Sequence, residues 1–567
     1  MLMTGAQILI QSLIDQGVDT LFGYPGGAVL NIYDELYKRK DEIRHILVSH
    51  EQGAAHAADG YARSTGRTGV ALATSGPGAT NLVTGIATAY HDSVPLVAIT
   101  GNVTLDLIGR DSFQEVDIVS ITNPIVKHNF FVTSADELAE TIRLAFEIAN
   151  SGRKGPVLVD IPKDITAAKA EFVSLPRFTV RANPEPDDAS FYTTASWIAG
   201  AERPLIYAGG GVTFSDASDM LNTFAEQIDA PVVLSMMGIS SMSASSPLNL
   251  GLVGMHGNPA ANMAVSACDL LITVGARFSD RVAGNRQSFA SEARIIHIDI
   301  DRAEISKNVA TNITLVGDAA DCLEKLLQHV KVLQQIKKAD NAEWRSEIDG
   351  FKRQHALPDA KSVGDAINPR EVITTVGELA PRDAIIATDV GQHQMYVAQY
   401  YPFNRPRTFL SSCGLGTMGY GMGAANGAAI GNPDKRVVLF TGDGSFHMNL
   451  AELAVAVSNN LKILVIVMNN SVLGMVHQWQ KLFYDGRYSS TEFDRKTDYV
   501  KLAEAFGARG LRLTHSADIR AVLTDALGTD GPCVIDCQIP PTERVFPIIP
   551  PGGGTEDMIY GEEERQA

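Results

Sequence analysis

Two short polar segments in this chain of 567 residues could together hold a divalent cation: Gly442-Asp443-Gly444 and Asn469-Asn470. Each follows an apolar run, Arg436–Phe440 before the first and Leu461–Met468 before the second, as expected for buried parallel strands. Apolar residues at helical spacing predict a helix between the two strands: Leu450, Leu453, Ala454 and Val457. The polar segments should therefore meet at the carboxyl edge of one open α/β sheet, where ligands bind.

The predicted site would offer only oxygen ligands. The Asp443 carboxylate, the Asn470 amide oxygen and a bare backbone carbonyl at the strand edge suit Mg²⁺, which takes few protein ligands and some phosphate oxygens. Gly444 and Ser445 would open the next helix, so their amides would point at an anion carried by the metal. Alone, GDG is usually a turn and NN usually a loop. The joint pattern, with 24 residues between them, is far more specific.

Glu51 is the most informative single carboxylate elsewhere in the chain. It follows the strand-like segment Ile46–Ser49 and precedes a helix start made of small residues, GAAHAADGYAR. We therefore expect it to be buried in a tight junction. Most glutamates that follow a strand are solvated or cap a helix, so from the residues alone a catalytic role for Glu51 is one hypothesis among these.

Strands that alternate with helices predict an α/β protein built from doubly wound parallel sheets. We expect one such unit over residues 1–165, beginning with a helix from Thr4 to Gly17, a second over 190–332 and a third over 367–545. The first and third share one plan of strand end, glycine turn and helix. Residues 336–365 are charged and predict a helix plus linker, and the Pro/Gly-rich 546–567 predict a mobile tail.

Bulk composition excludes several classes of function. The length predicts three or four domains, and 45% hydrophobic with 20% charged residues is ordinary for a globular enzyme. A net charge of −18 without a basic stripe argues against a nucleic-acid partner, and an anionic substrate would need local cations. The five scattered cysteines indicate buried thiols, and no segment resembles a signal peptide or a membrane span. We therefore expect a cytoplasmic protein that binds no membrane.

The sequence resembles the catalytic large subunits of acetohydroxyacid synthase, also called acetolactate synthase, a family of thiamine diphosphate enzymes. Matching stretches spread from about residue 20 to 480 and so cover nearly the whole chain. They include FGYPGGAVLNIYDEL, HEQGAAHAADGYAR, TSGPGATNLVTGIA, GARFSDRV, TDVGQHQM, GLGTMGYG and GMVHQWQ. Together they are far more specific than any one motif.

The resemblance implies a transferase that decarboxylates pyruvate on thiamine diphosphate. The hydroxyethyl carbanion passes to a second 2-keto acid, pyruvate or 2-ketobutyrate, which gives 2-acetolactate or 2-aceto-2-hydroxybutyrate. This is the first common step of valine, leucine and isoleucine biosynthesis. The implied cofactors are thiamine diphosphate, Mg²⁺ and FAD, the flavin without net redox use. The implied assembly is a homodimer with composite sites, a tetramer being a further option, and a small regulatory subunit is a candidate partner.

The resemblance also implies roles for individual residues. Glu51 would exchange a proton with the aminopyrimidine of the cofactor, and Arg281 would pair with the carboxylate of the second keto acid. Trp479 would favour 2-ketobutyrate, since one methylene against an apolar wall is worth roughly 1–3 kcal/mol. The Gly27 amide would meet the substrate oxygen. Phe113, Gln114 and Lys127 would line the entrance, although Lys127 could equally be a solvated lysine after a strand.

The implied cofactor contacts form three sets. Thiamine diphosphate would be held by Tyr24, Pro25, Glu51, Val390, Gly391, Gln392, His393, Gly416, Met418, Gly442, Asp443, Gly444, Ser445, Asn470 and Met475. The metal ligands would be Asp443, Asn470 and the carbonyl of Val472. FAD would be held by Arg153, Gly210, Gly211, His256, Gly275, Arg277, Asp299 and Ile300.

Three alternatives remain beside this interpretation. Another FAD-containing thiamine enzyme, such as a pyruvate oxidase or glyoxylate carboligase, is disfavoured by Arg281 together with Trp479. A flavin-free acetolactate synthase would lack a bound yellow chromophore, and Lys154 and Ser279 depart from the family pattern near the flavin candidates. A catalytically silent thiamine diphosphate binder is disfavoured by an intact Glu51.

Overall fold

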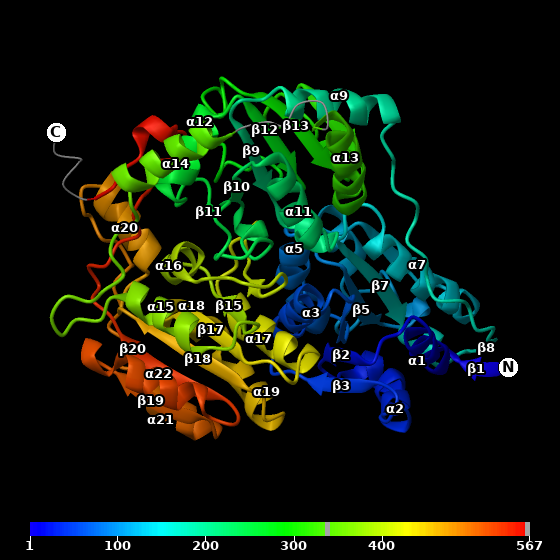
Figure 1. Ribbon diagram of the computed structural model, residues 1–567. Helices are drawn as coiled ribbons and strands as arrows, with labels where there is room; N and C mark the ends of the chain where they lie inside the picture. The colour runs from blue at the N-terminus through cyan, green and yellow to red at the C-terminus, as the bar shows by residue number, and fades with distance from the viewer. Residues whose placement is uncertain (335–340, 562–567) are drawn as a thin grey trace.

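The computed structural model describes residues 1–334 and 341–561. Three six-stranded parallel sheets, each flanked by helices, carry the fold (Figure 1). In Figure 1 the first unit runs from blue to cyan, the second is mainly green and the third runs from yellow to orange. The prediction of an α/β protein with three doubly wound parallel sheets is confirmed.

The first sheet has the strand order β3-β2-β4-β5-β7-β6. Its strands are β2 (Thr20–Gly23), β3 (Arg44–Leu47), β4 (Gly69–Ala73), β5 (Leu96–Asn102), β6 (His128–Phe131) and β7 (Pro156–Pro162). Its helices are α1 (Gly5–Asp15), α2 (Leu30–Lys38), α3 (Glu51–Thr65), α4 (Pro77–Asn81), α5 (Val83–His91), α6 (Ile118–Thr122), α7 (Leu138–Asn150) and α8 (Lys163–Ala167). Thr4 and Gln7 form a capping box at the start of α1, where the helix was predicted to begin. A small antiparallel pair, β1 (Leu2–Thr4) with β8 (Lys169–Glu171), closes the unit.

The second sheet has the order β11-β10-β9-β12-β13-β14. Its strands are β9 (Pro204–Ala208), β10 (Val232–Leu234), β11 (Asn249–Leu252), β12 (Leu270–Val274), β13 (Arg294–Asp299) and β14 (Ile313–Val316). Its helices are α9 (Asp188–Ala199), α10 (Gly210–Phe214), α11 (Ser218–Ile228), α12 (Pro259–Ala267) and α13 (Ala319–Gln334), and α14 (Ala342–Gln354) follows. Of the segment 336–365, predicted as helix plus linker, residues 336–340 lie outside the described residues and α14 supplies the helix.

The third sheet has the order β16-β15-β17-β18-β20-β19. Its strands are β15 (Ile385–Thr388), β16 (Phe409–Leu410), β17 (Val437–Gly442), β18 (Ile463–Asn469), β19 (Arg509–Leu513) and β20 (Cys533–Gln538). Its helices are α15 (Pro369–Leu379), α16 (Gln392–Tyr400), α17 (Tyr420–Gly431), α18 (Asp443–Asn449), α19 (Leu453–Ser458), α20 (Gly474–Phe483), α21 (Tyr499–Phe506) and α22 (Ile519–Leu527). The single helix predicted between β17 and β18 is instead α18 and α19 joined by the short 3₁₀ helix η7 (Leu450–Glu452).

The first and third units meet through the helices α3 and α17, which lie side by side at the centre of Figure 1. Small residues allow this close approach. A Cβ atom at Gly427 would overlap the backbone of Ala57, and one at Gly60 would overlap the backbone of Ala424. The helix start of small residues that follows Glu51 is therefore a packing surface between two units.

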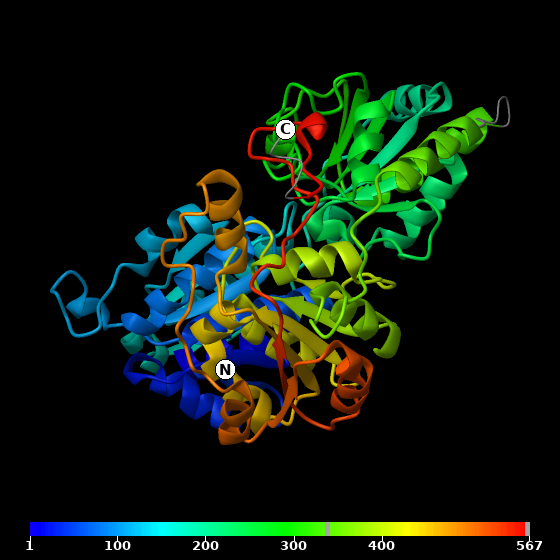
Figure 2. The same cartoon turned by 90° about the vertical axis from the view of Figure 1, so that its left-hand side faces the viewer.

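The C-terminal segment differs from its prediction. Residues 546–561, predicted to belong to a mobile tail, pack along the third and middle units (Figure 2). Ile548 is fully buried and pairs with Ile559, and the Ile549 N–H donates to the Met255 carbonyl at 2.8 Å. Apolar side chains between the prolines, which pack against Leu482, explain the difference. Residues 562–567 of the predicted tail lie outside the described residues.

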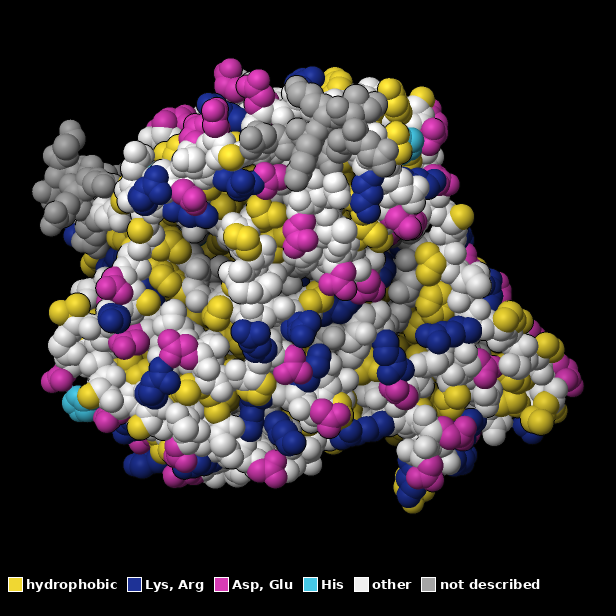
Figure 3. Space-filling model, in the orientation of Figure 1, with side chains coloured by type: hydrophobic (Ala, Val, Ile, Leu, Met, Phe, Trp, Pro, Cys, Tyr) yellow, Lys and Arg dark blue, Asp and Glu magenta, His cyan; other side chains and the backbone are white. Residues whose placement is uncertain are grey.

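The visible surface carries both signs of charge, and the cysteines are not paired. On the visible face in Figure 3, Lys and Arg side chains are intermingled with Asp and Glu. No helix within residues 1–334 and 341–561 is long and apolar enough to cross a bilayer. All five cysteines are free thiols, four of them buried and Cys413 partly exposed.

Candidate active site

The carboxyl edge of the third sheet brings Asp443 and Asn470 together. Asp443 opens α18 directly after β17, and its carboxylate accepts hydrogen bonds from the Gly444 N–H at 3.0 Å and the Ser471 N–H at 2.9 Å. The Asn470 side-chain oxygen accepts from the Val472 N–H at 3.2 Å. Burial raises the pKa of Asp443 to about 6, although the Arg495 guanidinium acts in the opposite direction. A cavity of about 60 Å³ opens beside these residues.

The donor set of this edge fits Mg²⁺. One carboxylate, one amide oxygen and the Val472 carbonyl are hard oxygen ligands, and all three residues line the cavity. Within the described ranges there is no group of three or more His, Cys, Asp or Glu side chains that could hold a metal ion in another way.

The lining of the same cavity also carries polar atoms without a hydrogen-bond partner. Among the described residues, Gln392 Oε1 and His393 Nε2 are buried without a hydrogen-bond partner. Burial lowers the pKa of His393 to about 3, so its ring is neutral at pH 7. Gly391, with φ of +151°, leaves the room that the ring needs, because a Cβ there would lie 3.0 Å from its Cε1 atom. Buried polar atoms without partners indicate a polar ligand.

Two buried residues that were not predicted from the sequence, Asp389 and Gln478, hold segments of the cavity lining in place. Asp389 is buried and accepts from the Gly419 N–H at 2.7 Å and the Thr441 hydroxyl at 3.0 Å, so it fixes the loop that carries Gly416 and Met418. Burial raises its pKa to about 6. Gln478 is fully buried and its Oε1 atom accepts from the Gln392 amide and from the backbone N–H at 545, each at 2.9 Å. The position of Asp389 after a strand was its one available signal.

The carboxyl edge of the first sheet gathers three of the predicted catalytic residues, Glu51, Gly27 and Gln114. Glu51 opens α3, is 9% exposed, and accepts from the Asn81 amide at 2.9 Å. The Gly76–Gly78 turn passes beside it, since a Cβ at Gly78 would lie 3.1 Å from Glu51 Oε1. A Cβ at Gly76 would in turn lie 2.9 Å from the Cα of Gln114.

The segment that follows β2 reaches the same edge. The Ala28 N–H, next to Gly27, donates to the Thr74 hydroxyl at 3.4 Å, and the Tyr24 N–H donates to the Leu72 carbonyl at 3.3 Å. Pro25 lies between these anchored positions. The structure therefore brings Glu51, Gly27 and Gln114 to one edge.

Within a single chain, Glu51 is not among the residues that line the Asp443 cavity. Large apolar side chains are exposed at the end of β3 and on α18: Leu47 and Met448 are both 57% exposed. Within one chain, the Glu51 group at the first sheet and the Asp443 group at the third sheet therefore do not line one common cavity.

A larger cavity, of about 970 Å³, lies between the middle unit and the other two. Its lining includes every predicted flavin residue: Arg153, Gly210, Gly211, His256, Gly275, Arg277, Asp299 and Ile300. It also includes Lys154 and Ser279, the two departures from the family pattern.

Contacts within the lining hold its polar groups in place. The Arg153 guanidinium donates to Glu304 at 2.8 Å and to the Ser93 hydroxyl at 2.9 Å. Burial raises the pKa of Asp299 to about 6 and lowers that of His256 to about 4. Gly275, with φ of +56°, lies so close to Gly211 that a Cβ on Gly211 would lie 2.6 Å from its Cα.

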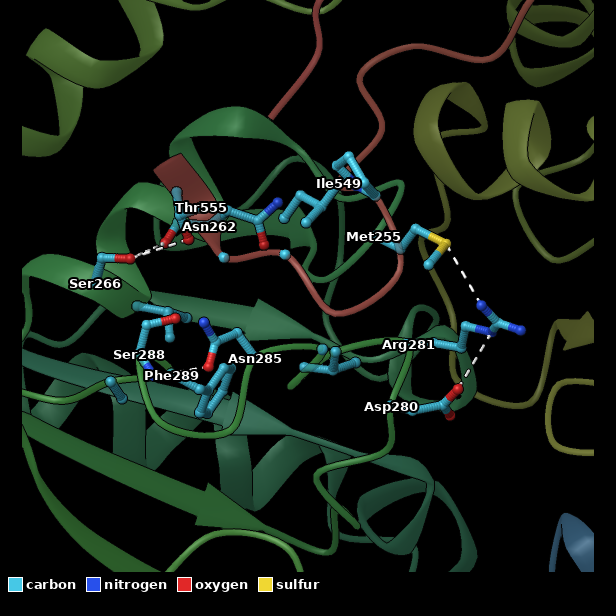
Figure 4. A pocket seen from close by; sticks show the side chains of 17 residues that line it. Met255, Asn262, Ser266, Asp280, Arg281, Asn285, Ser288, Phe289, Ile549 and Thr555 are labelled. Carbon is cyan, nitrogen blue, oxygen red and sulfur yellow. Dashed lines mark hydrogen bonds and ion pairs between the residues drawn. The ribbon is translucent and has the colours of Figure 1, made fainter. Parts of the chain in front are cut away.

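Arg281 and Trp479 meet in this larger cavity. The Arg281 guanidinium carbon lies 6.0 Å from the centre of the Trp479 ring, a cation–π contact. Figure 4 shows the Arg281 side chain between the Met255 sulfur, 3.7 Å from Nη1, and the Asp280 carboxylate, 3.7 Å from Nε. The Trp479 indole N–H is buried without a partner among the described residues. A cavity of about 30 Å³ is lined by Met255 and Arg281 together with Ile549 and Thr555 of the C-terminal segment.

The cavity of about 970 Å³ and the Asp443 cavity of about 60 Å³ share part of their lining. Val390, Gly391, Met418 and Met475 line both of them. Arg281 and Trp479 are therefore connected with the Asp443 edge through apolar side chains, which suit a water-poor site.

Lys127 and Phe113 lie away from both cavities. The Lys127 amine donates to the Ser151 carbonyl at 2.6 Å and to the Ile148 carbonyl, so it caps the end of α7. Burial lowers the pKa of Lys127 to about 8. Phe113 is 88% exposed. Their predicted place at a substrate entrance stays a prediction.

Fold and site together define the class of thiamine pyrophosphate enzymes, and three family models of this class match the chain. The "Thiamine pyrophosphate enzyme, N-terminal TPP binding domain" matches residues 3–121, the central domain matches 192–326 and the C-terminal TPP binding domain matches 389–537.

Curated relatives narrow the class. The chain is 43% identical to the acetolactate synthase large subunit of Buchnera aphidicola subsp. Acyrthosiphon pisum, over 99% of both chains. It is 45% identical to that of Parasynechococcus marenigrum, over 98% of this chain and 91% of the relative. It is 43% identical to the isozyme 2 large subunit of Escherichia coli, over 98% and 99%. The chain belongs to the acetolactate synthase large-subunit family.

Proposed function

We propose that this chain catalyses acetolactate synthesis. It would decarboxylate pyruvate and transfer the remaining hydroxyethyl group to pyruvate or 2-ketobutyrate, the first common step of branched-chain amino-acid biosynthesis. The observation that carries this proposal is the pair Arg281 and Trp479, 6.0 Å apart in a cavity that shares a wall with the Asp443 edge. A guanidinium matches the carboxylate of an acceptor keto acid, and an aromatic wall matches its alkyl group.

The residues that line the Asp443 cavity suit Mg²⁺ and the diphosphate end of thiamine diphosphate. Asp443, Asn470 and the Val472 carbonyl would hold the metal, and Gln392 and His393 would face the diphosphate with the unpartnered atoms described above. Thiamine diphosphate supplies the electron sink for decarboxylation of the keto acid. The protein itself would move the proton, exclude water and bind the acceptor.

Three kinds of side chain would perform these tasks. Glu51 would hold and return a proton at the aminopyrimidine nitrogen, a role for which a carboxylate in a tight junction is suited. Met418 and Met475 would exclude water from the reacting carbon. Arg281 would bind and orient the acceptor.

FAD fits the larger cavity. Its volume lies at the upper end of the range for small-molecule sites, and the Arg153 and Arg277 cations could face a diphosphate. The departures Lys154 and Ser279 leave this lining cationic and polar.

We infer a homodimer with composite active sites. Support comes from the separation of Glu51 from the Asp443 cavity within one chain and from the exposed apolar side chains near both edges, such as Leu47 and Met448. The relatives' designation as large subunits supports a small subunit as an additional partner. A biosynthetic role of this kind fits the cytoplasm.

Product analysis tests the proposed function. Purified protein with thiamine diphosphate, Mg²⁺ and FAD should convert pyruvate into 2-acetolactate and, when 2-ketobutyrate is added, mainly into 2-aceto-2-hydroxybutyrate. The protein should carry a yellow chromophore. Oxygen-dependent oxidation of pyruvate without any C–C bond formation would identify an oxidase instead, and colourless active protein would identify a flavin-free synthase.

A further inference from the structure

Glu452 joins the third unit to the start of α3. It ends η7, which continues the chain from α18 and so from Asp443. Its Oε1 atom accepts from the His50 N–H at 2.9 Å and the Ser49 N–H at 3.1 Å. These two residues immediately precede Glu51, and His50 is the N-cap of α3. One carboxylate from another unit therefore holds the turn that presents Glu51.

The surroundings of Glu452 are shaped for this contact. The side chain is 1% exposed, and a Cβ atom at Gly53 would overlap its carboxyl group, so it fills a notch in the first turn of α3 that glycine leaves open. The backbone around it is also held, because Asn426 donates to the Glu452 carbonyl at 2.9 Å and the Ser49 hydroxyl donates to the Ala451 carbonyl at 2.8 Å.

The second carboxylate oxygen has no structural task. Glu452 Oε2 is buried without a hydrogen-bond partner among the described residues. Burial raises the pKa of Glu452 to about 7, and the nearby Glu51 carboxylate contributes in the same direction. A pure packing role would be served better by an apolar side chain, since an unpartnered buried polar atom is destabilising.

We propose that Glu452 is a positioning residue for Glu51: by accepting two backbone N–H groups it fixes the first turn of α3 and thereby the direction of the Glu51 carboxylate. The segment 443–452 then connects the metal edge of the third sheet with the acid–base edge of the first. The inference rests on the proposed function only in assigning proton exchange to Glu51.

Three variants distinguish the effect of the hydrogen-bond acceptor at Glu452 from the effect of its negative charge. Glu452→Ala removes the acceptor, whereas Glu452→Gln keeps Oε1 as an acceptor and removes the charge. Gly53→Ala pushes the Glu452 carboxyl group out of its notch without removing it. Asp160→Asn is the matched control: Asp160 is a buried carboxylate in β7 whose partners are Thr100 and Asn102 rather than α3.

The first readout is hydrogen–deuterium exchange of residues 49 and 50 in protein free of cofactor, followed by mass spectrometry. Loss of hydrogen bonds to a charged acceptor should speed this exchange roughly tenfold or more in Glu452→Ala and Gly53→Ala. Glu452→Gln and Asp160→Asn should stay close to the unmodified protein, because both leave the acceptor in place.

The second readout is the exchange rate of the thiazolium proton of bound thiamine diphosphate, measured by NMR without substrate. Misplacement of Glu51 should slow it by roughly tenfold to a hundredfold in Glu452→Ala and Gly53→Ala. Glu452→Gln should restore most of the rate. Thiamine diphosphate affinity should change little, since Asp443 and Asn470 are untouched.

Two results would overturn the proposal. One is unchanged amide exchange in Glu452→Ala and Gly53→Ala. The other is slow thiazolium-proton exchange in Glu452→Gln with protected amides, which would make Glu452 a proton carrier. If Glu452→Ala does not fold, Gly53→Ala and Glu452→Gln still decide. Altered exchange in a protein that forms no acetolactate would reject the proposed function and leave the positioning role standing.

Discussion

The first and third sheets have the same architecture and different chemistry. Numbered along the chain within each unit, the strands of both sheets follow the order 2-1-3-4-6-5, whereas the middle sheet follows 3-2-1-4-5-6. In the third unit the carboxylate follows the third strand, as Asp443 after β17. In the first unit it follows the second strand, as Glu51 after β3. The shared order supports the interpretation that one unit arose by duplication of the other.

The two sheets differ in the few residues that follow corresponding strands. After β4, the counterpart of β17, the first unit has Thr74-Ser75-Gly76, which offers no cation ligand of the Asp443 kind. After β16, the counterpart of β3, the third unit has Ser411-Ser412-Cys413-Gly414, whereas the first unit has Val48-Ser49-His50-Glu51 after β3. Strand order fixes where groups can lie. In the proposed function, two or three residues at each strand end would determine whether an edge binds a metal ion or exchanges a proton.

The middle sheet provides a second contrast. Its strand order places β9 beside β12 at the point where the connections change direction, and ligands bind at such points. Gly210, Gly211 and Gly275 lie there, in the wall of the larger cavity. A different strand order thus accompanies a different kind of ligand site.

The largest expected effect is on the metal edge. Asp443→Asn should weaken Mg²⁺-dependent binding of thiamine diphosphate by on the order of a hundredfold or more, because it removes the charged oxygen ligand. Calorimetric titration at several Mg²⁺ concentrations measures this. Asp160→Asn is the control, since Asp160 is a buried carboxylate of the first unit that binds Thr100 and Asn102 instead. Equal Mg²⁺ dependence in Asp443→Asn and the unmodified protein would remove the metal role.

A smaller effect is expected at the acceptor wall. Trp479→Leu should lower the preference for 2-ketobutyrate over pyruvate by roughly tenfold, because the aromatic contact with one methylene is lost. Pyruvate consumption should be largely retained, and a competition assay with product quantification gives the ratio. Phe483→Leu, on the same helix and 5.6 Å from the Trp479 ring, is the matched control. A product ratio that stays constant in Trp479→Leu would contradict the assignment.

The smallest expected effect concerns the link between the sheets. The pKa of Glu452 is about 7 in the folded protein and 4.5 for an ordinary glutamate. The free energy of unfolding therefore falls as the pH rises from 4.5 through 7. Glu452→Gln should therefore stabilise the cofactor-free protein at pH 8 by about 1–3 kcal/mol. The gain should vanish near pH 4, where both forms are neutral. Denaturant titrations at both pH values measure it, and an equal gain at pH 4 would contradict this account.

Much of the fold could be predicted because each buried strand is a local apolar run that ends at a glycine or polar turn. Arg436–Phe440 and Leu461–Met468 correspond to β17 and β18 within two residues at each end. The packed segment 546–561 could not be predicted in this way. Its proline and glycine content indicates mobility, whereas contacts with distant residues such as Leu482 and Met255, together with the pairing of Ile548 with Ile559, hold it in place.

The site was predictable where a motif is local and unpredictable where a contact is distant. The GDG and NN motifs identified Asp443 and Asn470, and the resemblance identified the lining of the larger cavity. Glu452 binds residues 402 and 403 positions away in the sequence, which no local pattern reveals. Asp389 and Gln478 act through the same kind of distant contact.

In the proposed dimer, the first sheet of one chain supplies Glu51 and the third sheet of the other chain supplies Asp443 to the same active site. Glu51→Gln and Asp443→Asn should each be nearly inactive alone. Dimers that carry one chain of each kind, co-expressed with two different tags and purified through both, should regain about half of the unmodified activity, because one of two composite sites is intact. Doubly tagged dimers no more active than either variant alone would contradict the account.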